Sequence, residues 1–112
     1  MEHIRPAQLH DWLAQHSEGP QPLVLDVREP WEVQTASVTP TGFELLNIPM
    51  QQIPAALNQL DEDRPIACLC HHGMRSLQVA HFLEQQGYSQ ITNITGGIDL
   101  WSAEQDNGVP RY

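Results

Sequence analysis

Two short and almost unbroken apolar runs constrain the fold of this chain more than any other feature. Residues 23–27 read LVLDV, in which Asp26 is the only polar position, and residues 66–70 read IACLC. Such runs are typical of strands buried on both faces, as in a parallel sheet covered by helices. Each run therefore predicts a central strand of a sheet.

Segments with helical spacing lie beside these strands. In residues 6–16 the apolar or amphipathic positions follow an i, i+3, i+4, i+7 spacing, and the same kind of pattern predicts a helix over 76–87. A helix with proline in its first turn is predicted over 54–60, and a final helix over 98–105. These segments separate the strands from one another along the chain.

The remaining segments complete an alternating pattern. Short strands are predicted over 44–48 and 91–94, a short helix over 31–36, and a turn-rich linker over 37–42. Strands that alternate with helices predict the α/β class with a central, mostly parallel sheet. A chain of 112 residues has the size of one ordinary domain, so we expect a single domain over 1–112.

The charge balance of the chain excludes two classes of partner. Five Arg and no Lys stand against 14 Asp and Glu, which gives a net charge of −9. Such a surface repels the phosphates of nucleic acid and the head groups of anionic lipid. The longest apolar run, 66–70, is far too short to span a bilayer, and the N-terminus has no apolar signal core. We therefore expect a soluble cytoplasmic protein with no nucleic-acid or membrane partner.

The two cysteines, Cys68 and Cys70, are too close together to close a stabilising loop, which excludes a disulfide framework. His71 and His72 could in principle join Cys70 in a metal site. However, adjacent residues on a short loop rarely all face one tetrahedral centre. We therefore expect neither a metal nor another cofactor.

Cys70 stands where an α/β sheet places its ligands, beyond the carboxyl end of a strand and before a helix. Loop N–H groups that curl around its sulfur, and the positive end of the following helix, would both favour the nucleophilic thiolate. Gly73 would permit the backbone conformation that such a loop needs. The alternative is that Cys70 is a small buried core residue and Gly73 only a turn residue.

Three segments together resemble the motifs of rhodanese-like sulfurtransferases. Residues 70–76 read CHHGMRS, which is similar to the active-site loop of that family. Residues 26–29 (DVRE) resemble its Asp-x-Arg motif, and residues 96–101 (GGIDLW) resemble its Gly-Gly-x-x-x-Trp motif. The motifs occur in the family's order, and the resemblance covers roughly residues 9–101. The chain departs from the family at 36–43 (ASVTPTGF), where a short His-containing turn is usual.

The resemblance implies a rhodanese-like fold, with helices on both faces of the sheet, and a site complete within one domain. It also implies that the catalytic Cys70 carries sulfur as a persulfide. Its thiolate would take sulfur from thiosulfate or a persulfide donor and pass it to a thiol, a protein or cyanide. Loop amides would hold the terminal sulfur, and Arg75 would offset the charge of an anionic donor. The implied substrate-binding residues are His71, His72, Gly73, Met74 and Arg75.

Several side chains have both a functional and a structural interpretation. Asp26, in an apolar strand, needs a partner; it could support the site together with Arg28 and Ser76, or pair with Arg28 for structure alone. His71 and His72 could contact the donor or be solvated spacers. Side-chain alternation along the strand makes Cys68 an inert core residue, and both Trp12 and Trp101 are predicted to anchor the core.

Two other functions remain open. The related cell-division-cycle phosphatases, and arsenate reductases with them, also use a Cys followed by an Arg. Their motif resembles Cys-x5-Arg, whereas four residues separate Cys70 from Arg75 here. The chain could also be a non-catalytic binding module, although inactive relatives commonly replace the cysteine.

Overall fold

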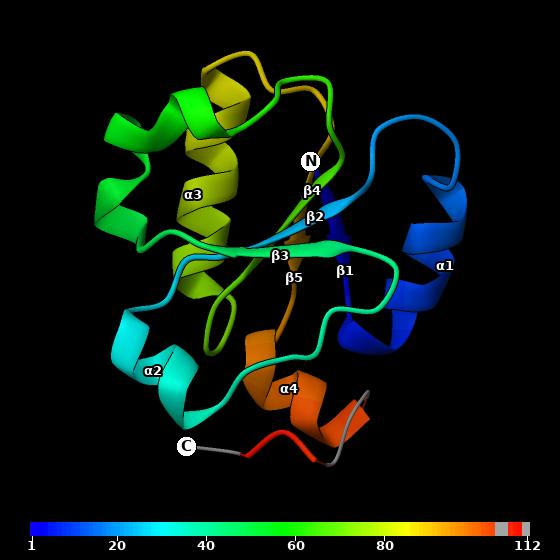
Figure 1. Cartoon of the computed structure of the whole chain (residues 1–112), viewed down its shortest axis with the longest axis vertical. Coiled ribbons are helices and arrows are strands. Elements are labelled where there is room, and N and C mark those ends of the chain that lie inside the picture. The colour runs from blue at the N-terminus through cyan, green and yellow to red at the C-terminus, as the bar shows by residue number, and fades with distance from the viewer. Residues whose placement is uncertain (105–107, 111–112) are drawn as a thin grey trace.

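Five parallel strands form the centre of the fold, which a computed structural model describes for residues 1–104 and 108–110 (Figure 1). Their order across the sheet is β1-β5-β4-β2-β3, and every neighbouring pair is parallel. The strands are β1 (Glu2–Ile4), β2 (Leu23–Asp26), β3 (Glu44–Asn47), β4 (Ile66–Leu69) and β5 (Ile91–Ile94). The α/β class and the parallel sheet are confirmed, and β1 is an additional edge strand.

The helices also follow the predicted order, with corrected boundaries. They are η1 (Pro6–Gln8), α1 (Leu9–Gln15), α2 (Pro30–Thr35), η2 (Met50–Gln52), η3 (Pro54–Gln59), α3 (Met74–Gln85) and α4 (Gly97–Glu104). The helix expected over 54–60 is a 3₁₀ helix, and Gln105, the expected last residue of the final helix, lies outside the described residues. Within 1–104 and 108–110, no helix has the length and apolar character needed to cross a membrane.

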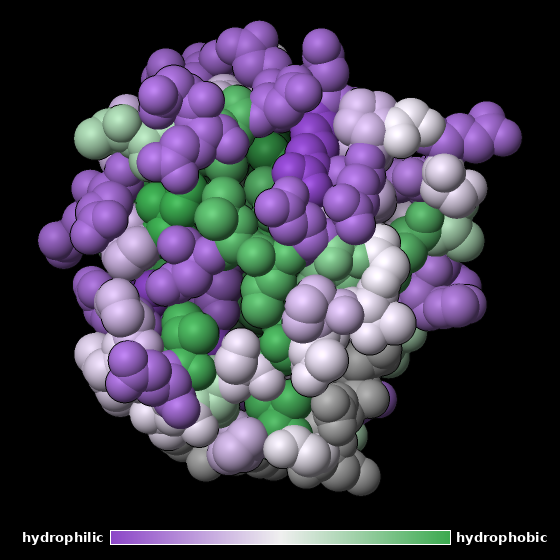
Figure 2. All heavy atoms as spheres, viewed as in Figure 1, coloured by the Kyte–Doolittle hydropathy of each residue, from purple (hydrophilic) through white to green (hydrophobic). Residues whose placement is uncertain are grey.

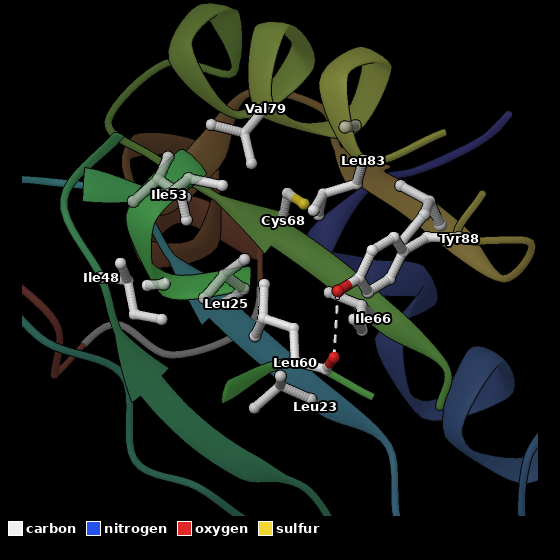
Figure 3. Close-up of a cluster of buried hydrophobic side chains, with 14 of the residues drawn as sticks. Leu23, Leu25, Ile48, Ile53, Leu60, Ile66, Cys68, Val79, Leu83 and Tyr88 are labelled. Atoms are coloured by element: carbon white, nitrogen blue, oxygen red, sulfur yellow. Dashed lines mark hydrogen bonds between the residues drawn. The ribbon is translucent and has the colours of Figure 1, made fainter. Parts of the chain in front are cut away.

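Because successive side chains of a strand point to opposite faces, the central strands contribute to two apolar layers, one on each face of the sheet. Leu25 and Cys68 belong to the layer beneath α3, η2 and η3, where Figure 3 shows the Cys68 sulfur beside Leu83. Trp12 of α1 and Trp101 of α4 belong to the layer on the opposite face, and both are buried as predicted. Helices therefore cover both faces, which explains why the central strands read as continuous apolar runs.

The linker at 37–42 is irregular, as predicted, but it is anchored to the core at both ends. Val38 is buried, and Phe43 packs edge-on against Trp101 with ring centroids 6.3 Å apart. Next to Phe43, β3 forms an edge of the sheet with Leu45 and Leu46 half-buried. Figure 2, in the same view as Figure 1, shows apolar side chains in the middle of the visible face and hydrophilic ones mainly along its upper and left edges.

A buried ion pair between Asp26 and Arg28 lies at the carboxyl end of β2. The Arg28 Nη2 atom lies 2.7 Å from Asp26 Oδ2, and neither side chain is more than 1% exposed. Arg28 also donates from Nη1 to the Glu32 carbonyl at 3.2 Å, while Asn47 Nδ2 donates to the carbonyls of Asp26 and Arg28. These contacts tie β2, β3 and α2 together, and they give the Asp-x-Arg motif a structural role.

We expect Asp26→Ala to lower the free energy of unfolding by about 3–5 kcal/mol, because it leaves the buried Arg28 guanidinium without its carboxylate. Urea unfolding followed by circular dichroism measures this change. Glu44→Ala is the matched control, since it removes a half-exposed carboxylate from the Arg64 ion pair and should cost less than about 1 kcal/mol. Equal losses in the two variants would contradict the structural role of the buried pair.

Candidate active site

The loop that carries Cys70 is short and sharply curled. β4 ends at Leu69 and α3 begins at Met74, so only residues 70–73 connect them. Gly73 is the residue before α3 and has a φ of +103°, a conformation that residues with a side chain rarely adopt. This conformation directs the Gly73 N–H to the Cys70 sulfur, with N···Sγ at 2.9 Å. The loop thus supplies a backbone donor to the sulfur.

The Gly-Gly turn before α4 fixes the loop from the other side. The Ile98 N–H donates to the Cys70 carbonyl at 2.8 Å, and the Asp99 N–H donates to the His71 carbonyl at 3.1 Å. A Cβ on Gly97 would lie 2.3 Å from the Cys70 carbonyl oxygen, so only glycine allows this approach. Two of the three sequence motifs therefore meet at one point, and the second holds the first in place.

Cys70 is only 1% exposed and is also hydrogen-bonded to a polar side chain. Its thiol donates to Ser76 Oγ at 3.4 Å, and that hydroxyl in turn lies 2.6 Å from Asn93 Oδ1 and 3.1 Å from the Gly73 carbonyl oxygen. The same hydroxyl could rotate and donate to a thiolate. Ser76 is thus brought to the site, while Asn93 on β5 was not predicted. An amide side chain in the short predicted strand ITNI, next to Ile94, was the available signal.

Cys68 lies below the loop and has different surroundings. It is fully buried, and burial, followed by the nearby Cys70, raises the pKa of the Cys68 thiol from its ordinary value of 9.0 to about 12. The thiol is therefore uncharged at neutral pH. Its predicted place in the core is confirmed.

Cys68 should make the fold sensitive to alkali. Between about pH 9 and pH 12 the unfolded chain releases the Cys68 proton while the folded chain keeps it, so stability falls by up to about 1.4 kcal/mol per pH unit. Cys68→Ala should remove this part of the loss, as measured by urea unfolding at several pH values. At neutral pH this variant should cost about 1 kcal/mol of stability. A variant that loses stability above pH 9 as steeply as the wild-type protein would contradict this prediction.

Arg75 forms a bidentate ion pair with Glu32, a carboxylate that the sequence analysis did not single out. Its Nη1 and Nη2 atoms lie 2.6 Å and 2.7 Å from the two carboxylate oxygens of Glu32. Glu32 is 4% exposed, and one of its oxygens also accepts the Glu29 N–H at 2.9 Å. This arrangement is a capping box at the start of α2, which a Glu three residues after Glu29 could have indicated. The role of Arg75 toward a donor stays a prediction.

The two histidines stack on each other at the outer side of the loop. Their ring centroids are 3.9 Å apart with an interplanar angle of 28°. The His72 side chain is 65% exposed, and its Nδ1 lies 4.0 Å from Asp99 Oδ2. Met74 is 68% exposed, so its side chain points to solvent rather than toward the buried sulfur. Both histidines are part of the Cys70 loop, and their contact with a donor stays a prediction.

The fold and the site define a class of protein: an α/β domain with one buried cysteine in a tight loop at the carboxyl end of a parallel sheet. The model of the family described as rhodanese-like domain matches residues 9–104. The chain belongs to the rhodanese-like family, as the resemblance of its motifs indicated.

Similar proteins agree with this assignment. A protein of Allochromatium vinosum named sulfurtransferase is 34% identical over 88 residues, covering 79% of this chain and 76% of that protein. The rhodanese-like/PpiC domain-containing protein 12, chloroplastic, of Arabidopsis thaliana is 34% identical over 97% of this chain, which spans only 36% of the plant protein. The crystal structure of a rhodanese-like domain protein from Staphylococcus aureus superposes with a TM-score of 0.74, at 27% identity, over 100% of this chain and 99% of that one.

Proposed function

We propose that this protein is a sulfurtransferase in which Cys70 carries sulfane sulfur from a small donor to a thiol acceptor. The observation that carries the proposal is the contact between the Gly73 N–H and the Cys70 sulfur at 2.9 Å, with the Ser76 hydroxyl at 3.4 Å. A backbone donor and a rotatable hydroxyl can stabilise a thiolate and, after transfer, the sulfur bound to it. The sulfurtransferase name of a relative supports the same chemistry.

The transfer needs two displacement steps at sulfur. The Cys70 thiolate attacks the outer sulfur of the donor, a new S–S bond forms, and the old bond to that sulfur breaks, so that the rest of the donor leaves with the electron pair. Thiosulfate would release sulfite, and a thiol persulfide would release its thiolate. The acceptor thiolate then attacks the outer sulfur of the Cys70 persulfide and regenerates the Cys70 thiolate. No redox cofactor is needed, because the sulfane sulfur only changes its partner.

The geometry favours sulfur transfer over phosphate chemistry. A phosphoryl group needs donors for three oxygens around an in-line attack, and in Cys-x5-Arg loops the arginine is available for this purpose. Here the loop has one residue fewer, and the Arg75 guanidinium is bound to Glu32 through both terminal nitrogens. We therefore expect no meaningful hydrolysis of aryl phosphates.

The direct test is the intact mass of the protein after incubation with sulfane-sulfur donors. We expect one added sulfur atom from thiosulfate, from a low-molecular-weight persulfide, or from both, and we expect an added thiol acceptor to remove it. Peptide mapping should place the sulfur on Cys70. If none of the donors modifies the protein, and the fold is intact, the proposal of a non-catalytic binding module replaces this one.

A further inference from the structure

The arginines that the structure describes are all paired with carboxylates. Each of the four arginines within residues 1–104 and 108–110 is in an ion pair with a carboxylate, and the chain contains no lysine. The pairs are Arg5–Glu104, Arg28–Asp26, Arg64–Glu44 and Arg75–Glu32. Of these arginines, Arg75 stands in the first turn of the helix that begins at the Cys70 loop. An anionic donor that approaches Arg75 therefore meets a guanidinium whose charge Glu32 already balances.

Glu32 is held firmly in this role. Its side chain is almost fully buried, both oxygens bind the Arg75 guanidinium, and one oxygen also closes the capping box with the Glu29 N–H. Removing Arg75 from Glu32 would leave a buried carboxylate without its cation, which is costly. A donor must therefore compete with a preorganised bidentate partner before it can use Arg75.

We propose, on the basis of the sulfurtransferase function above, that Glu32 sets the charge of the accepted donor by neutralising Arg75. The site then favours sulfane-sulfur donors that carry one negative charge or none, such as thiol persulfides, over the dianion thiosulfate. The reason is electrostatic: attack by a thiolate on a dianion gathers three negative charges at one loop, and the Arg75 guanidinium, already balanced by Glu32, offsets them only weakly. Glu32 acts through Arg75 and is therefore a positioning residue.

Two donors with the same reacting sulfur separate charge from chemistry. Thiosulfate carries two negative charges, while an alkyl thiosulfonate, such as methanethiosulfonate, carries one. In both, the Cys70 thiolate attacks the terminal sulfur, an S–S bond forms, and the bond to the oxidised sulfur breaks. The leaving group is sulfite from thiosulfate and a sulfinate from the thiosulfonate. The rate of Cys70 persulfide formation with each donor is divided by the rate at which the same donor reacts with free cysteine. This normalisation removes the intrinsic difference in reactivity between the two donors.

The proposal predicts the donor preference and its change in one variant. The wild-type protein should prefer the thiosulfonate by roughly tenfold or more after this normalisation, the size expected for one charged hydrogen-bonding contact. Glu32→Gln keeps an oxygen for the Glu29 N–H but removes the charge that balances Arg75. It should raise kcat/KM for thiosulfate about tenfold and change that for the thiosulfonate by less than about threefold.

Glu29→Gln is the matched control, because it removes an exposed carboxylate at the start of the same helix that is not the ion-pair partner of Arg75. It should leave the donor ratio unchanged.

The inference is overturned if the wild-type protein uses both donors equally after normalisation, or if Glu29→Gln moves the ratio as much as Glu32→Gln. It is also overturned if a folded Glu32→Gln leaves the ratio unchanged. Should Glu32→Gln not fold, the wild-type ratio decides alone. Failure of the wild-type protein to accept sulfur from either donor and from a low-molecular-weight persulfide would instead contradict the sulfurtransferase function itself.

Discussion

Replacing Cys70 by Ser is expected to abolish persulfide formation, with a loss of at least about 10³-fold in the rate of sulfur transfer. A serine hydroxyl is not ionised at neutral pH and cannot hold sulfur as a persulfide. A cysteine can form the thiolate that attacks the donor, and its sulfur can then carry the transferred atom. The change replaces one small buried atom by another. The free energy of unfolding should therefore fall only slightly, and the loss of activity reports chemistry rather than folding.

Intact-mass measurement after donor treatment checks this expectation, with thermal unfolding in parallel. Cys68→Ala is the matched control, because it removes the other thiol of the chain and leaves the loop unchanged. That variant should still gain one sulfur atom. A sulfur adduct that persists in Cys70→Ser, or that is absent in a folded Cys68→Ala, would refute the assignment of Cys70 as the sulfur carrier.

The sequence was sufficient to predict the central part of the fold. The runs 23–27 and 66–70 are apolar because helices cover both faces of the sheet, and a pattern of this kind depends on burial alone. β1 was missed for the opposite reason: it has three residues, of which only Ile4 is buried, and so it shows no pattern. Its place at the edge is set by pairing with β5, a contact between segments about 90 residues apart.

The candidate site was predicted in part, and the missing part consists of partners distant in sequence. Motif spacing indicated Cys70 and its loop, since these residues are adjacent in the chain. The ion pair of Glu32 with Arg75 joins residues 43 positions apart, and the contact of Asn93 with Ser76 joins residues 17 apart. Spacing cannot show which of the chain's many carboxylates meets Arg75. The structure therefore adds a carboxylate partner to Arg75, and that contact is the basis of the inference on donor charge.

The contact of Gly97 with the Cys70 loop predicts the second large effect. Gly97 has a φ of +58°, and an added Cβ would lie 2.3 Å from the Cys70 carbonyl oxygen and 2.5 Å from that of His71. Both are backbone atoms of the loop, so relief of the clash must displace the loop itself. Because a displacement of about 1 Å can cost 10²-fold in rate, we expect Gly97→Ala to slow sulfur transfer by roughly 10²-fold or more.

Gly87→Ala separates this displacement from backbone strain. Gly87 has a φ of +96°, also in the left-handed region, but nothing lies within 4 Å of its added Cβ. Both variants should lose about 1–2 kcal/mol of stability from the unfavourable backbone conformation, as measured by urea unfolding. Only Gly97→Ala should also lose activity while it remains folded, because only there does the methyl group press on the atoms that position Cys70. A folded Gly97→Ala with wild-type rates would mean that the Gly-Gly turn does not hold the loop in its active conformation.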